Sequence, residues 1–254
     1  MAGRFLKPRQ SFDEIAANFE NRFGKSLPKP ILHQAHIGDS LSLIYSPFYL
    51  KDKLYDAILA KPVAAKMDED FNIDDFDGGG PTWHIRFVST LCPNCGWTLE
   101  GRRDTLVLNC KNCNSCWYPV GKKLKQLKFA QIPGAGDNTI HLPFWRIRAD
   151  ISGISLRSYA DLIRIANLPK AVQNGWADIP FRFWIPAFKV RPQQFLRLAS
   201  HLTVSQPREE LIPELPGNRI HPGTLPVKEA IESLPITLAK FIKPRKTLME
   251  TFHK

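Results

Sequence analysis

The chain has 254 residues, of which 43% are apolar and 11% aromatic, and this composition excludes a largely disordered protein. Its length is enough for one large domain or two smaller ones. The net charge is +11 although residues 67–77 carry six acids and no base, so the remaining surface favours anionic partners. No run approaches about 18 apolar residues, which excludes a conventional transmembrane helix. The first residues lack the apolar core of a secretory signal, and we expect a cytoplasmic protein.

The N-terminal third is predicted to contain one helix followed by strands. Ser11 and Glu14 have the spacing of a capping box, and the apolar residues after them recur on one helical face. We therefore place an N-terminal helix within residues 1–30. Residues 31–91 have strand-like patterns and are assigned to the first part of a β-domain, interrupted by an acidic, glycine-rich loop at 66–81.

Three further helices are predicted in the C-terminal half. Ser158 has the pattern of an N-cap with Asp161 three residues later, while Pro192 and Pro226 each open a segment with apolar residues at helical spacing. Pro235 falls inside the last of these patterns. Because proline lacks the N–H that a helix interior needs, we expect it to kink or split that helix.

Three aromatic-rich segments, each interrupted by proline, form a weak internal repeat at 44–50, 140–147 and 184–190. Proline cannot donate to a strand ladder, so each segment belongs at a sheet edge or bulge. Their aromatic side chains either form a surface that grips a ligand or fill the core of one β-domain. We favour the core, because large aromatic residues on strands are usually buried.

Four cysteines in two pairs are the strongest chemical signal in the sequence. Cys92 and Cys95 form one pair, Cys110 and Cys113 form the other, and 14 residues separate the pairs. A two-residue spacer lets each pair curl into a knuckle whose sulfurs face the same side, as tetrahedral metal coordination requires. The spacing also allows a second set of four metal ligands, in which Cys116 replaces Cys110. We favour the first set, because Cys110 follows directly on a predicted strand.

The segment from Cys92 to Cys113, with Gly96 after the first pair, resembles the zinc ribbon, in which two knuckles lie at the ends of short antiparallel strands. The resemblance covers residues 92–120, and the chain around it resembles bacterial proteins that carry such a ribbon beside Pro-Phe-Trp strands. It implies a Zn²⁺ ion bound by four thiolates. An iron site of the rubredoxin type uses the same four sulfurs, but no electron-transfer partner is evident and zinc is favoured.

A four-thiolate site has a direct consequence for function. Four protein ligands complete a tetrahedron and leave no open position for water or substrate, so we expect the ion to hold structure together without catalysing a reaction. Together, the patterns predict an α+β fold. An antiparallel β-domain carries the zinc ribbon as an insertion, residues 121–210 form its second part with helices, and residues 211–254 form a C-terminal helical segment.

Basic and aromatic residues surround the cysteine pairs. The candidate contacts for nucleic acid or for a protein partner are Arg102, Arg103, Lys111, Lys122, Lys123 and Trp117. No RNA-binding signature or recognition helix accompanies them. The basic segment 240–246 has a composition that suits an anionic membrane surface.

No catalytic pattern is found in the sequence. A Ser/His/Asp arrangement, a glycine-rich phosphate loop and a His-Glu-x-x-His helix are all missing, so we expect neither an enzyme nor a small-molecule substrate. The role predicted is that of a non-catalytic, zinc-binding adaptor that engages another macromolecule, in the first place a protein. The alternatives are a nucleic-acid-binding zinc-ribbon protein and a peripheral membrane component.

Overall fold

In the computed structural model of the chain, the described residues are 10–26, 33, 35, 37–38, 46–63, 72, 87–133, 138–166, 168–217 and 219–242. The chain divides into two compact units, one of Met1–Lys29 with Ser40–Arg86 and one of Pro30–Asp39 with Phe87–Lys254. The predicted loop at 66–81, apart from Asn72, and most of the basic segment 240–246 lie outside the described residues.

The first unit contains the predicted N-terminal helix, α1 (Phe12–Phe23), followed by a short 3-10 turn, η1 (Gly24–Ser26). The capping box is confirmed, because the Ser11 hydroxyl accepts the N–H of Glu14 at 3.3 Å and the Glu14 carboxylate accepts the N–H of Ser11 at 2.7 Å. This unit also contains an antiparallel three-stranded sheet in the order β1-β2-β3, made of β1 (Phe48–Leu50), β2 (Leu54–Asp56) and β3 (Lys61–Pro62).

The core of the second unit is built on an antiparallel pair, β8 (Phe144–Ile147) and β9 (Phe183–Pro186). These strands are two of the three repeated aromatic segments, and they are hydrogen-bonded to each other with Phe144 opposite Pro186. All of β9 is buried, as predicted. The copy at 44–50 does not fill a core as predicted, because the side chains of β1 within it are exposed.

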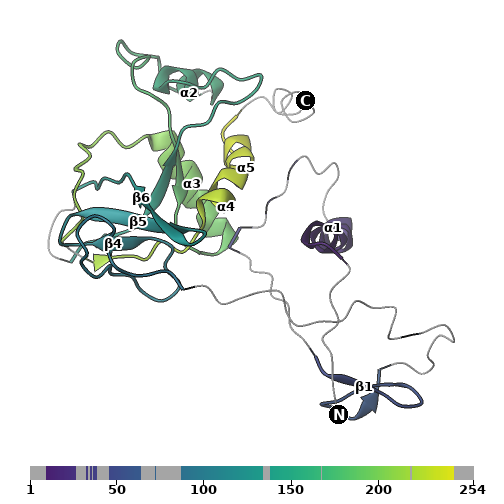
Figure 1. Ribbon diagram of the computed structural model, residues 1–254. Coiled ribbons are helices and arrows are strands. Elements are labelled where there is room, and N and C mark those ends of the chain that lie inside the picture. Colours follow the sequence, from purple (N-terminus) through teal and green to yellow (C-terminus); the bar gives the residue numbers. More distant parts are fainter. Residues whose placement is uncertain are drawn as a thin grey trace. The chain divides into compact units, whose positions relative to one another are not determined.

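Four helices pack around this pair, and Figure 1 shows three of them, α3, α4 and α5, close together. Helix α3 contacts β9, α4 contacts β8, and α5 contacts α3. The predicted split at Pro235 is confirmed, because α4 ends and α5 begins on either side of Ser233. The bounds are α2 (Tyr159–Ile165), α3 (Pro192–Ser205), α4 (Val227–Glu232) and α5 (Leu234–Ala239).

The cysteine module, residues 91–127, has its own three-stranded antiparallel sheet in the order β4-β5-β6. It is made of β4 (Leu108–Cys110), β5 (Ser115–Val120) and β6 (Lys123–Leu127). Cys92, Leu99, Cys110 and Trp117 form a small buried cluster of their own. The module is tied to the rest of its unit by a backbone hydrogen bond of 2.7 Å from Leu106 to Gly223.

The fold is α+β, as predicted, with helices beside small antiparallel sheets. One described pair departs from the antiparallel pattern. Strands β7 (Ile140–His141) and β10 (Arg219–Ile220) run parallel, which requires a long connection between them. That connection contains β8, α2, β9 and α3.

Candidate metal centre

The first knuckle is a tight turn that ends at Gly96. The N–H of Gly96 donates to the carbonyl of Cys92 at 2.8 Å, and the N–H of Cys92 donates to the carbonyl of Trp97 at 2.7 Å. Gly96 has φ of 74°, in the left-handed region that glycine enters without steric cost. The chain then returns antiparallel, with a bridge between Leu91 and Thr98. The sequence Cys-x-x-Cys-Gly therefore closes on itself locally.

The second knuckle has the same construction with a different residue at the turn. Cys110 ends β4, Cys113 lies in the turn, and Asn114 takes the left-handed conformation with φ of 52°. Asparagine tolerates this region better than most residues with a Cβ. The Asn114 side chain also accepts the N–H of Leu215 at 2.7 Å and donates to the carbonyl of Pro213 at 3.2 Å. Asn114 thus anchors the second knuckle to the C-terminal part of the chain.

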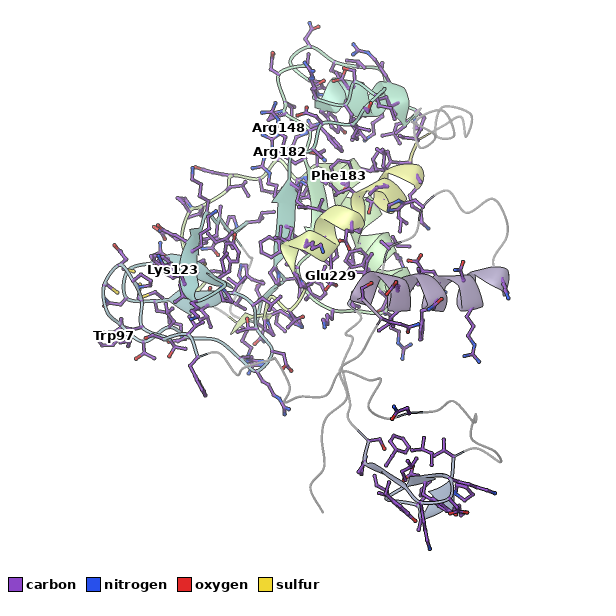
Figure 2. All side chains as sticks on the ribbon, turned by 45° about the vertical axis from the view of Figure 1, so that its right-hand side comes forward. Trp97, Lys123, Arg148, Arg182, Phe183 and Glu229 are labelled. Atoms are coloured by element: carbon purple, nitrogen blue, oxygen red, sulfur yellow. The ribbon has the colours of Figure 1, made fainter. Side chains whose placement is uncertain are left out.

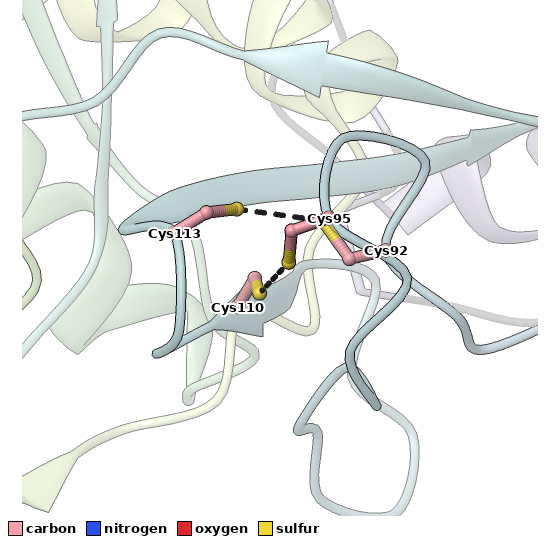
Figure 3. Close-up of side chains that lie close together, drawn as sticks. All are labelled: Cys92, Cys95, Cys110 and Cys113. Carbon is pink, nitrogen blue, oxygen red and sulfur yellow. Dashed lines mark hydrogen bonds between the residues drawn. The ribbon is translucent and has the colours of Figure 1, made fainter.

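The two knuckles bring four sulfurs together (Figure 3). The Sγ atoms of Cys92 and Cys113 are 3.5 Å apart, as are those of Cys95 and Cys110, and all four lie within 4.8 Å of one another. Metal–sulfur bonds of about 2.3 Å in a tetrahedron give sulfur–sulfur distances of about 3.8 Å. The observed distances bracket this value, so the predicted four cysteines are placed where they could bind one metal ion.

Cys116 takes a different position. Its thiol is buried and donates to the Oδ1 atom of Asn109 at 3.2 Å. Burial raises the pKa of Cys116 to about 12, and this thiol is not among the four sulfurs that converge. Burial also raises the pKa of Cys110, to about 11, but Cys110 belongs to the group of four converging sulfurs. The set in which Cys116 replaces Cys110 is therefore not the one that the fold assembles.

Hydrogen-bond donors around the site favour thiolates at two of the cysteines. Burial raises the pKa of Cys92, but the backbone N–H groups of Asn94 and Cys95 and the side chains of Cys113 and Ser115 together lower it to about 6. The pKa of Cys113 is lowered as well, first of all by the hydrogen bond from Ser115. Backbone and hydroxyl donors aimed at sulfur are the surroundings that stabilise metal-bound thiolates.

Ser115 is a member of the site that the sequence analysis did not single out. Its side chain is buried, and its Oγ atom lies 3.1 Å from the Sγ of Cys113 and 3.8 Å from the Sγ of Cys92. The same oxygen accepts the indole N–H of Trp117 at 2.8 Å. Strand alternation could have indicated that Ser115 lies beside Trp117 in the site, since the two residues are two positions apart on β5 and share one face.

The predicted contact residues fall into two groups. Trp117 is 7% exposed and its indole N–H is bound to Ser115 beside the sulfurs, so little of its surface is open to a partner. The exposed tryptophan of the module is Trp97, at 59% (Figure 2). Among the predicted cations, Lys111 forms an ion pair of 2.7 Å with Glu100. Arg103 lies 4.0 Å from the carboxylate of its neighbour Asp104. All five predicted cations are exposed, the remaining three being Arg102, Lys122 and Lys123.

Comparison with protein-family models, with curated protein sequences and with solved structures finds no match to this chain. None of the helices in the described part of the chain has both the length and the apolar character needed to cross a bilayer. Among the described residues, the four cysteines are the group of His, Cys, Asp and Glu side chains that converge closely enough to hold a metal ion.

Proposed function

We propose that the protein is a non-catalytic, zinc-binding adaptor in which the metal stabilises the cysteine module and the module contacts a partner protein. The observation that carries this proposal is the convergence of four sulfurs from two knuckles. Four thiolates suit Zn²⁺, which has no preference beyond tetrahedral coordination by soft ligands. Such a site leaves no coordination position for a substrate, so its contribution is structural. It also requires reduced cysteines, and a cytoplasmic location supplies them.

The contact surface that we assign to the partner protein lies at the first knuckle. Leu91 and Trp97 are 55% and 59% exposed, and they flank the turn that holds Cys92. Exposed tryptophans often dominate the binding energy of protein interfaces. Arg102 and Arg103 on the following turn are exposed as well, so an apolar patch with an acidic rim would be complementary to this end of the module.

A combined measurement of metal content and partner capture tests this proposal. Freshly purified full-length protein should contain close to one equivalent of zinc per chain. Native lysate should yield a partner that is retained by the wild type and lost by Trp97→Ala. Val120→Ala is the matched control, because Val120 is also exposed, at 49%, but lies at the far end of β5. A metal content near zero, or equal capture by Trp97→Ala, would refute the proposal.

Nucleic-acid binding by the cysteine module is the second candidate function. It is supported by the exposure of Arg102, Lys122 and Lys123, none of which forms an ion pair with a described residue. Phosphate contacts by these cations would make binding fall steeply with salt. Lack of binding to any single-stranded oligonucleotide at low salt would eliminate this candidate. The membrane-associated alternative depends on the segment 240–246, of which residues 243–246 lie outside the described part of the chain.

A further inference from the structure

The face of the β8–β9 pair that points away from the core carries arginines. Trp145 and Ile147 of β8 pack against the core of the second unit. Side chains alternate along a strand, so Arg146 points to the opposite face, and Arg148, one residue beyond the end of β8, continues this alternation. Both arginines are exposed. Two arginines at alternate positions are separated by about 6.8 Å along the strand direction.

Strand β9 adds a third arginine to this face. Phe183 packs in the core, so its neighbours along the chain, Arg182 and Trp184, face the other way. The ladder pairs Ile147 with Phe183, which makes Arg148 and Arg182 the next residues opposite each other, and Figure 2 shows both at this end of the sheet.

The three arginines, Arg146, Arg148 and Arg182, are called the arginine face below. Like charges directly opposite each other across a strand pair, as Arg148 and Arg182 are here, are destabilising, and no acidic side chain in the described part of the chain forms an ion pair with them. The ion pairs formed by described residues involve other side chains. Partial burial, together with the nearby charges of Arg146 and Arg148, lowers the pKa of Arg182.

The arginine face is held in place by its surroundings. Gln206, at the end of α3 and only 5% exposed, accepts the N–H of Arg182 at 3.1 Å and donates to the carbonyl of the same residue. The guanidinium group of Arg146 lies 5.7 Å from the centre of the Trp184 ring, which restricts its movement. The guanidinium group of Arg182 donates to the carbonyl of Phe181 at 2.8 Å. The side chains of Arg146 and Arg182 are therefore partly ordered and lose less entropy when they bind an anion.

We propose that the arginine face binds the phosphate backbone of single-stranded nucleic acid. The charge pattern is complementary to a polyanion, since three cations with no described counter-ion would gain one from each phosphate. Guanidinium groups suit phosphate because they present two parallel N–H donors. The separation of Arg146 and Arg148, at alternate positions along the extended chain, suits successive phosphates of an extended nucleic-acid strand. Binding at this face is independent of the partner contact at Trp97.

Titration of a labelled single-stranded oligonucleotide of about 20 nucleotides with the full chain tests this inference. Wild-type protein should bind at about 50 mM salt and weaken steeply towards about 200 mM. Arg148→Gln removes an exposed side chain and Arg182→Gln keeps the backbone bonds to Gln206, so both variants should fold. The double variant should bind at least about tenfold more weakly, with a salt slope reduced by about 1.4, since each phosphate contact on a single strand contributes about 0.7.

Lys228→Gln is the matched control for net charge. Lys228 is 88% exposed and lies on α4, which packs near β8 through the core and not on the arginine face. The affinity of the Lys228→Gln protein for the oligonucleotide should equal that of the wild type. Arg102→Gln should retain most of the affinity if the arginine face is the main site.

Several results would overturn the inference. These are wild-type protein that does not bind the oligonucleotide at low salt, a double variant that binds as tightly as the control, or stronger binding to phosphatidylserine vesicles or polyglutamate than to the oligonucleotide. Complete competition by millimolar inorganic phosphate would point to a free-anion site and would also overturn it. The capture experiment at Trp97 is unaffected by any of these outcomes, so the two proposals fail or succeed separately.

Discussion

Replacing Ser115 with alanine is expected to weaken metal binding and to destabilise the cysteine module. The Ser115 hydroxyl is the point at which the sulfur site and the small core of the module meet. It donates to the sulfur of Cys113 at 3.1 Å and accepts the indole N–H of Trp117 at 2.8 Å. Alanine removes both hydrogen bonds while leaving the strand β5 and all four cysteines in place.

The size of each effect follows from the burial of the groups involved. Loss of a hydrogen bond from an outer residue to a metal ligand typically lowers metal affinity by about 10- to 100-fold. The N–H of Trp117 would be left buried without an acceptor, which costs about 1–3 kcal/mol of unfolding free energy. Trp117 is 7% exposed, so water cannot readily replace the lost hydroxyl.

Metal competition against a chromophoric chelator measures the first effect, and denaturant unfolding of the metal-bound protein measures the second. Trp117→Phe is the matched control, because it deletes the indole N–H but keeps Ser115 beside the sulfurs. It should retain most of the metal affinity. Combining Ser115→Ala with Trp117→Phe should cost less stability than the two single costs added together, since no donor is then left unpaired. A Ser115→Ala protein with wild-type affinity and stability would refute the role given to this hydroxyl.

Three further outcomes are expected. Removing the metal with a chelator should abolish the NMR amide dispersion of the cysteine module, while the amides of the β8–β9 core keep theirs. The reason is that structural zinc contributes about 10–16 kcal/mol, as much as the stability of a whole domain. A metal-free sample with unchanged spectra would contradict this. Elemental analysis should find one metal per chain in Cys116→Ala and a loss in Cys110→Ala, and equal loss in both would reverse the ligand assignment. Ser158→Ala should cost about 1 kcal/mol through the lost helix cap, measured by thermal unfolding.

The cap of α2 also predicts a pH dependence. Partial burial raises the pKa of Asp161, but hydrogen bonds from Ser158 and Arg157 and the charge of Arg164 outweigh it, so the folded pKa lies below the ordinary value of 3.8. A lowered pKa contributes stability that is present above the unfolded pKa and lost as the pH falls through the folded pKa. Asp161→Asn should therefore be less stable than the wild type at neutral pH, with the difference closing below about pH 4. A difference that persists at low pH would show that the carboxylate charge is not its cause.

Local patterns were enough to predict several features of this protein. The helices after Ser11 and Ser158 begin where their capping boxes lie, because both partners of each box are three residues apart and meet without help from the rest of the chain. The split at Pro235 follows from a missing N–H. The first knuckle is equally local, since it closes through its own backbone hydrogen bonds and a left-handed Gly96. The second closes through the pairing of Cys110 with Ser115 and a left-handed Asn114, whose side chain is also bound to Pro213 and Leu215.

Features that depend on which strand pairs with which could not be predicted from local sequence patterns. Trp97 and Trp117 have the same chemistry and lie at similar distances from a cysteine pair, yet one is exposed and the other is buried. The difference arises because β5 is the central strand of its sheet, while Trp97 lies at the tip of a knuckle. Similarly, the two aromatic repeats that pair as β8 and β9 gave no indication in the sequence that their register would place Arg148 opposite Arg182.

The pattern of residues over short distances was sufficient to identify the four ligands, the helix starts and the α+β class, because hydrogen bonds and thiolate geometry within a few residues specify them. Assigning the partner contacts required the arrangement of strands in space. Side-chain exposure depends on which face of which strand is covered, and that is settled by contacts between residues far apart in the chain. For that reason the candidate contact moved from Trp117 to Trp97, and the arginine face appeared only once β8 and β9 were aligned.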